Sequence, residues 1–224
     1  MFDHVGIDLG YEDLEAVTTS NGRMYPTPEG KKYPSITTVL SILSQDAIRA
    51  WRARVGEEEA NKISHRASTR GTAVHSIIEK YVDNEEEFSK GFMPNVVESF
   101  KSVKPILDNR IGKVYAQEVP LYSDHLGVAG RVDCIAEFDG KLSVIDFKTA
   151  KKQKKHEYIT NYFMQETFYA IAWEERTGLP ITQLVTIISV DDDEPQVFIE
   201  HRDRWDKQLV ETINEYRRRK LFGH

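Results

Sequence analysis

Two apolar segments joined by Asp139-Gly140 constrain the fold of this chain most, because they predict a tight β-hairpin over residues 130–148. An Asp-Gly pair between β-branched and aromatic residues is a strong signal for a two-residue turn. Residues equally far from such a turn face each other, so Asp133 is predicted to lie opposite Asp146. Counting outward from the turn makes them a non-hydrogen-bonded pair, in which the Cα atoms are only about 4.5 Å apart.

The predicted pair of aspartates indicates a cation site. Two like charges directly opposite each other are unfavourable in a sheet, and the neighbouring residues are apolar, which predicts burial. Buried adjacent carboxylates need either a shared proton or a cation. Lys148 lies two residues after Asp146 and therefore projects from the same face. Two carboxylates and a lysine suit a Mg²⁺ or Mn²⁺ site for phosphodiester cleavage.

Four short motifs extend this interpretation. They are Gly71-Thr-Ala-Val-His75, Gly130-Arg-Val-Asp133, Asp146-Phe-Lys148 and Gln165-Glu-Thr-Phe-Tyr169, in that order. Together they resemble the GxxxH, GxxD, (D/E)xK and QxxxY motifs of PD-(D/E)xK nucleases in their RecB-like branch. The YPSITTVL, RGTAVH and VIDFKTAKK segments are similar to mitochondrial genome maintenance exonucleases and their phage relatives. The resemblance covers roughly residues 33 to 200.

The resemblance implies a fold and a set of roles. The fold is α/β and restriction-endonuclease-like, an αβββαβ core whose mixed central sheet is flanked by helices. The metal ligands would be His75, Asp133, Asp146 and the backbone carbonyl of Phe147. Lys148 would support the attacking water, while Gln165 and Tyr169 would position the site. Glu118 is a further candidate ligand, although an ordinary edge-strand residue explains it equally well.

Hydrophobic periodicity and capping residues place the elements. Strands are expected at 114–121, 128–138, 142–149, 181–190 and 196–201. Longer helices are expected at 57–84, 94–109, 157–176 and 204–221, and short helices capped by Ser35 and Asp46 before them. Residues 1–33 are expected to form an extended or loosely packed arm. Residues 34–224 then form a single nuclease domain, with a helical elaboration at 34–70.

The charge pattern suggests where DNA could bind. The net charge of −6 is unusual for a nucleic-acid binder, but the charges are segregated, and a local basic channel is compatible with a negative total. The candidates are an aromatic residue among arginines, two arginines upstream of His75 and a lysine cluster after the hairpin: Trp51, Arg66, Arg70, Lys151, Lys152, Lys154 and Lys155. A solvated surface explains the two arginines and the lysine cluster about equally well, and an ordinary helix docked by its tryptophan is the alternative for Trp51.

Several classes are excluded or disfavoured. No apolar run approaches the roughly 20 residues of a membrane span, so no membrane association is expected. The single cysteine, Cys134, rules out an internal disulfide and argues against a four-cysteine iron–sulfur cluster. No phosphate-binding GxxxxGK[ST] loop is present. The absence of a visible leader favours the cytosol of a bacterium or phage-infected cell over the mitochondrial matrix.

The sequence therefore predicts a Mg²⁺- or Mn²⁺-dependent deoxyribonuclease. A helical cover at 34–70 and the family resemblance favour an exonuclease that degrades linear single-stranded DNA from a free end, in DNA repair or replication. Two alternatives stay open. One is a structure-specific endonuclease on the same fold, and the other is a non-catalytic module that binds DNA ends in a recombination or repair complex.

Overall fold

A five-stranded mixed sheet forms the centre of the computed structural model, which describes residues 1–20 and 22–223. Its strands, in spatial order, are β4 (Ile111–Ser123), β5 (Val128–Phe138), β6 (Lys141–Ala150), β7 (Gln183–Val190) and β8 (Gln196–His201). All neighbours are antiparallel except β6 and β7. A parallel pair needs a crossover, which α5 (Thr160–Thr177) supplies. The predicted α/β class and mixed sheet are confirmed.

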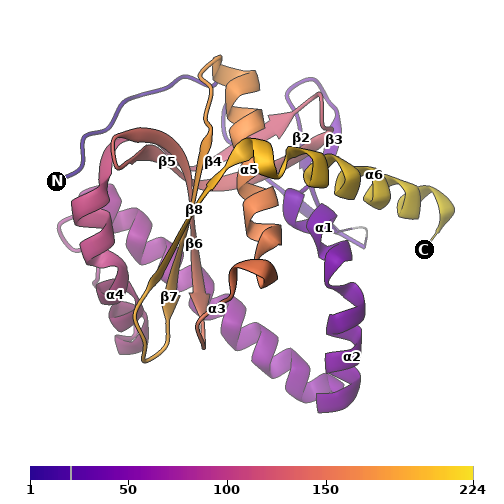
Figure 1. The fold of residues 1–224 in the computed structure, drawn as a ribbon, viewed down its shortest axis with the longest axis horizontal. Coiled ribbons are helices and arrows are strands. Elements are labelled where there is room, and N and C mark those ends of the chain that lie inside the picture. The colour runs from indigo at the N-terminus through magenta and orange to yellow at the C-terminus, as the bar shows by residue number, and fades with distance from the viewer. Residues whose placement is uncertain (21, 224) are drawn as a thin grey trace.

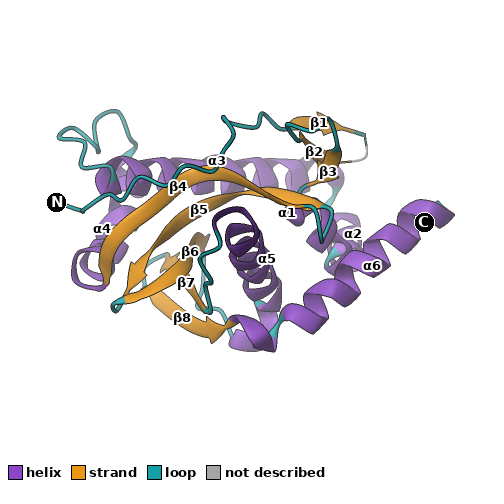
Figure 2. Cartoon of the chain, turned by 90° about the horizontal axis from the view of Figure 1, so that it is seen from above, coloured by secondary structure: helices purple, strands orange, loops and turns teal. Residues whose placement is uncertain are grey.

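Helices cover both faces of this sheet. On one face lie α3 (Glu57–Val82) and α4 (Pro94–Arg110), and on the other lie α5, α6 (Asp206–Phe222) and the short α1 (Ile36–Leu40) (Figures 1 and 2). The second half of α3 buries a helical stripe formed by Val74, Ile77 and Ile78. The resulting three-layer arrangement buries each face of the sheet in its own apolar core.

The hairpin has the predicted register. Asp139 and Gly140 have φ values of 51° and 76°, and a two-residue turn with both central residues at positive φ matches the twist of the strands. The ladder runs from Phe138↔Lys141 to Cys134↔Ile145. It stops one pair short of Asp133 and Asp146, whose side chains therefore lie where regular pairing ends.

The first 33 residues are more ordered than predicted. They contain the strands β1 (Val17–Thr19), β2 (Gly22–Pro26) and most of β3 (Lys32–Pro34), which form an antiparallel three-stranded sheet. Tyr25 in β2 is only 2% exposed and belongs to a small apolar cluster with Leu14, Tyr122 and Ala129. Burial against residues about 100 positions away leaves no local pattern, so the sheet formed by β1, β2 and β3 was not expected, whereas residues 1–16 form no helix and no strand beyond one isolated bridge at His4.

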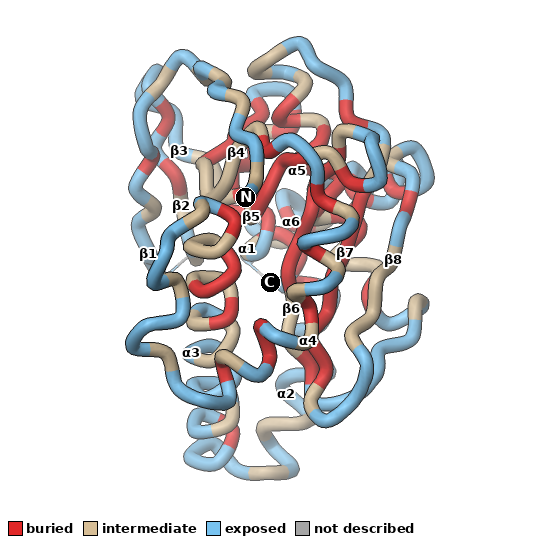
Figure 3. The backbone as a smooth tube through the Cα atoms, turned by 90° about the vertical axis from the view of Figure 1, so that its left-hand side faces the viewer, coloured by how far each residue is buried: buried red, intermediate tan, exposed pale blue. Residues whose placement is uncertain are grey.

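A helical hairpin precedes the core. Ser35 caps α1 as predicted, accepting a hydrogen bond from the Thr38 amide. The next helix, α2 (Gln45–Val55), begins before Asp46 and has no side-chain cap, so the predicted Asp46 cap is wrong. No residue of α2 is buried, and the first half of α3 is largely exposed (Figure 3). The helical elaboration predicted at 34–70 therefore exists and stands beside the core.

Within the described part of the chain, no helix combines the length and the apolar character needed to cross a membrane.

Candidate active site

All of the predicted catalytic residues except Asp146 line one cavity of about 730 Å³. β4, β5 and β6 form its base, while α3 and α5 supply its walls. Five of the predicted residues and the candidate Glu118 contribute to its lining: His75, Glu118, Asp133, Lys148, Gln165 and Tyr169. Asp146, at 1% exposure, lies beneath the surface of the cavity and contacts it through Lys148 and Gln165.

Three acidic residues occupy neighbouring strands at the same level. The pairs Gln117↔Cys134 and Val119↔Val132 bracket Glu118, which places it across from Asp133. Asp146 follows on the next strand, one step beyond the last hairpin pair. Glu118 has a φ of 47°, a conformation that non-glycine residues adopt rarely and at a cost in energy. The fold thus concentrates negative charge across three adjacent strands and accepts backbone strain there.

His75, Glu118 and Asp133 form a possible metal site. The ligand atoms of these three side chains all lie within 4.8 Å of one another. His75 Nδ1 is 3.5 Å from Asp133 Oδ1 and 3.9 Å from Glu118 Oε1. Asp133 Oδ2 accepts a hydrogen bond of 2.8 Å from the Phe147 amide, which leaves Oδ1 facing the other two ligands. Carboxylate oxygens with one imidazole fit a divalent cation such as Mg²⁺ or Mn²⁺.

The charges of this triad are mutually dependent. Burial alone would lower the pKa of His75, but the Asp133 and Glu118 carboxylates outweigh it and raise that pKa to about 10. Burial would raise the pKa of Asp133, but His75, Lys148 and the Phe147 amide together outweigh it, so that pKa is lowered. The shifted pKa values of His75 and Asp133 therefore have the same cause, the attraction between the imidazole and the neighbouring carboxylates.

The buried Asp146 and the partly exposed Lys148 form an ion pair beside the triad. Burial raises the pKa of Asp146 to about 6, against the opposing effect of Lys148. The Lys148 ammonium also lies 5.1 Å from the centre of the Tyr162 ring, a cation–π arrangement. Among the described residues, the set of side chains close enough to share a metal ion is His75, Glu118 and Asp133, and it does not include Asp146. The roles of Asp146 and of the Phe147 carbonyl as metal ligands stay predictions.

Gln165 and Tyr169 lie on the α5 face that meets the sheet. The Gln165 amide donates to Asp146 Oδ1 over 3.3 Å and to the Tyr169 hydroxyl over 3.5 Å. The Tyr169 ring lies so close to Gly130 that a Cβ there would be 2.9 Å from it. The glycine of the predicted GxxD motif is thus required for the approach of α5 to β5.

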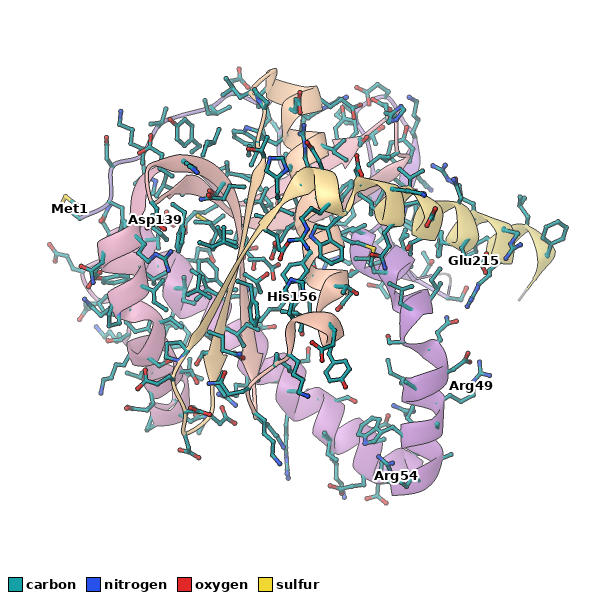
Figure 4. All side chains as sticks on the ribbon, viewed as in Figure 1. Met1, Arg49, Arg54, Asp139, His156 and Glu215 are labelled. Atoms are coloured by element: carbon teal, nitrogen blue, oxygen red, sulfur yellow. The ribbon has the colours of Figure 1, made fainter. Side chains whose placement is uncertain are left out.

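The predicted DNA-binding residues lie outside the cavity. Trp51 is half-buried on α2, and Arg66 is exposed on α3. The four lysines of the loop after β6 are all exposed, and none forms an ion pair with another described residue. Arg49, which precedes Trp51 by two residues, projects from α2 on the side away from the sheet (Figure 4). Contact of these residues with phosphates stays a prediction.

Arg70 differs from its prediction. Its guanidinium forms an ion pair with both carboxylate oxygens of Asp191, one at 2.7 Å, and donates to Ser99 Oγ over 2.9 Å. These partners lie in α4 and just after β7, and Arg70 lines a different cavity. Its bonds connect α3 to the core, so a role as a phosphate ligand is not supported by its position.

Sequence reasoning missed several residues of the cavity, among them Arg23, Glu79, Arg131 and Tyr162. Two had a usable signal: Glu79 lies four residues after His75 on one helix face, and Tyr162 lies three before Gln165. Arg23 and Arg131 had none, because their position depends on the N-terminal sheet and on strand register.

Comparisons with known proteins agree with this geometry. The family model of the PD-(D/E)XK nuclease superfamily matches residues 45–222. Mitochondrial genome maintenance exonuclease 1 of Homo sapiens is 31% identical over 145 residues, which cover 60% of this chain and 40% of that protein. The Mus musculus protein is 29% identical over 131 residues, covering 54% and 38%. The chain thus spans less than half the length of these curated relatives.

A crystal structure from Eubacterium rectale, described as a candidate exonuclease, aligns with 69% of this chain and 66% of its own. The TM-score is 0.45 and the sequence identity is 14%.

Proposed function

Since the chain belongs to the PD-(D/E)XK nuclease superfamily, we propose that it is a Mg²⁺- or Mn²⁺-dependent DNA exonuclease that degrades linear single strands from a free end. One observation carries this proposal. The ligand atoms of His75, Glu118 and Asp133 lie within 4.8 Å of one another beside the Lys148–Asp146 ion pair, and all of these residues except the buried Asp146 line one cavity. The similarity to mitochondrial genome maintenance exonucleases supports the choice of exonuclease.

The residues have separable tasks. His75, Glu118 and Asp133 would hold the cation, which, when bound, polarises the phosphate and activates water. The Lys148 ammonium, fixed by Asp146 and the Tyr162 ring, supplies positive charge where negative charge develops on the reacting phosphate. Gln165 holds the Asp146 carboxylate in place, and Tyr169 holds Gln165.

The preference for single strands rests on two features. A cavity of about 730 Å³ has the size of a small-molecule site, with room for on the order of one or two nucleotides rather than a duplex. The exposed α2–α3 hairpin presents Trp51 among arginines beside the core, and stacking of a base on an aromatic ring contributes roughly 1–3 kcal/mol. A flexible strand can follow such a surface, whereas a stiff duplex cannot.

A metal dependence test separates this function from a binding module. The purified protein is incubated with end-labelled linear single-stranded DNA in Mg²⁺, Mn²⁺, Ca²⁺ or EDTA. We expect short products with Mg²⁺ or Mn²⁺, little cleavage with Ca²⁺ and none in EDTA. Full cleavage in EDTA would remove the metal mechanism. Tight binding without cleavage in any of the four conditions would favour the DNA-end-binding module.

A further inference from the structure

The cavity continues beyond the catalytic residues to a second group of polar side chains. Arg23 of β2 and Thr37 of α1 line it together with the metal-site residues. The backbone around Arg23 is firmly placed, since its amide donates to Thr38 Oγ1 over 3.1 Å and its carbonyl accepts from the Ser35 amide over 2.8 Å. These two bonds join β2 to the start of α1, so Arg23 and the hydroxyl groups of that turn share one wall of the cavity.

Arg23 differs in its partners from the two other Lys and Arg side chains that line the cavity. Lys148 is paired with Asp146, and Arg131 is bonded to Asp13 and to the Glu118 carbonyl. Among the described residues, no carboxylate lies within 4.0 Å of Arg23. Its guanidinium instead lies 5.4 Å from the centre of the buried Tyr25 ring. The ring supports the cation and leaves its N–H donors available.

The ligand that fits this wall is a phosphate group. A guanidinium binds phosphate oxygens through two parallel hydrogen bonds and does so well when stacked on an aromatic ring. Thr37 Oγ1, which is exposed and 2.9 Å from Ser35 Oγ, adds a hydroxyl beside it. Glu79, Glu118 and Asp133 make much of the remaining lining acidic. These carboxylates repel the phosphates of a nucleic-acid strand, and the Arg23 guanidinium offsets part of that repulsion.

We propose that Arg23 and the Thr37 hydroxyl form a phosphate subsite, which binds a second phosphate of the strand whose scissile phosphodiester lies at the metal site. This inference rests on the proposed function and deepens it. The second phosphate is either an internal phosphodiester or a terminal 5′-phosphate, because both present the same anionic oxygens. The subsite would fix the register of the strand in the cavity.

The test measures binding separately from cleavage. Fluorescence anisotropy follows binding of single-stranded oligodeoxythymidylate, with either a 5′-phosphate or a 5′-hydroxyl, in Ca²⁺ at several salt concentrations, because little cleavage is expected with this ion. The variants are Arg23→Gln, Arg23→Lys and Thr37→Val. Arg218→Gln is the matched control, because it removes the same charge from an exposed side chain of α6 outside the cavity. Melting temperatures verify that each variant is folded.

We expect Arg23→Gln to weaken binding about tenfold, because a hydrogen-bonded ion contact is lost. The salt dependence of binding should flatten by about 0.7 log unit, the value for one phosphate contact on a single strand. Arg23→Lys should keep the slope and lose part of the affinity, since lysine keeps the charge without the bidentate geometry. Thr37→Val should weaken binding less, and Arg218→Gln should match the wild type.

The two oligonucleotides identify the phosphate. If Arg23→Gln removes a wild-type preference for the 5′-phosphate, the subsite binds the strand end, and if both oligonucleotides lose equally, it binds an internal phosphodiester. Equal behaviour of Arg23→Gln and Arg218→Gln overturns the subsite, as does a wild type that binds neither oligonucleotide. A wild type that binds through Arg23 but never cleaves with Mg²⁺ or Mn²⁺ overturns the nuclease proposal and leaves the phosphate subsite standing.

Discussion

Lys148 is the residue on which the proposed chemistry depends most, because Asp146 holds its ammonium group in the active site. Its ammonium is bonded to Asp146, which is buried, and faces the Tyr162 ring, which lines the same cavity. An ammonium fixed in this way needs no reorganisation when negative charge develops nearby. The same arrangement makes Asp146 dependent on Lys148, because no other cation is bonded to this carboxylate among the described residues.

Lys148→Ala should reduce the rate of DNA cleavage by at least about two orders of magnitude, since charge stabilisation at the reacting phosphate is lost. DNA binding should survive. Single-turnover cleavage assays measure the rate, and anisotropy measures the binding. A Lys148→Ala variant that cleaves at the native rate would exclude the lysine from catalysis.

The same variant should carry a pH-dependent loss of stability. With Lys148 removed, the pKa of Asp146 rises further because burial is no longer opposed, and the ionised carboxylate is unfavourable in the folded state. An acid whose folded pKa lies above its unfolded value destabilises the fold as pH rises above the unfolded pKa. Thermal melts should therefore show a larger deficit relative to wild type at pH 8 than at pH 5. Asp146→Asn in the Lys148→Ala background should remove that difference.

His75 makes metal binding a proton-coupled event. Because the neighbouring carboxylates raise its pKa to about 10, the imidazole is protonated at neutral pH and must lose its proton to bind a cation. The affinity for Mn²⁺ should rise with pH between 7 and 9, by up to about tenfold per pH unit. Calorimetry in buffers of different ionisation enthalpy should detect release of about one proton, which His75→Gln should abolish. Binding of Mn²⁺ without any proton release would show that His75 is not a ligand.

Among the secondary-structure elements, α3 links the exposed helical hairpin to the active site. Its largely exposed first half packs with α2 in that hairpin, and its second half carries His75. Arg70 lies between these halves and is bonded to Asp191, which directly follows β7. The ion pair is partly buried, with side chains 21% and 31% exposed. It fixes the helix just before the turn that presents His75.

Arg70→Ala and Asp191→Ala should therefore destabilise the protein by similar amounts, on the order of 1–3 kcal/mol. A double-mutant cycle from denaturant unfolding should give a coupling energy of about 1 kcal/mol or more. The salt dependence of DNA binding should stay at the wild-type value in both variants. If Arg70→Ala flattened that dependence while Asp191→Ala did not, Arg70 would be a phosphate ligand after all.

The sequence was informative for elements whose cause is local. The Asp139-Gly140 turn and the alternating residues beside it determine the hairpin register, and Ser35 caps α1 as expected. Elements that depend on distant partners were missed. Tyr25 is ordered by Tyr122 and Ala129, and Arg70 is oriented by Asp191, 121 positions away. Glu118 stayed ambiguous because its position in the site depends on a positive φ.

At the scale of the whole molecule, the fold combines a buried central sheet with an exposed helical hairpin formed by α2 and the first half of α3. The sheet and α5 form the floor and one wall of the cavity that contains the catalytic residues. In contrast, α2 and the first half of α3 stand beside the core with few buried residues (Figures 1 and 3). This division predicts that substitutions on α2, such as Trp51→Ala, weaken single-strand binding and leave the metal site intact. The proposed exonuclease activity requires in addition that a strand reach the cavity from one of its ends.

The need for an end is tested most directly by a time course on the same single-stranded DNA in linear and covalently closed circular form, with Mg²⁺, beside the Lys148→Ala variant. We predict that the wild type converts the linear strand to short products while the circle stays intact, and that Lys148→Ala leaves both unchanged. Cleavage of the circle as fast as the linear strand would contradict an exonuclease and assign the site to an endonuclease.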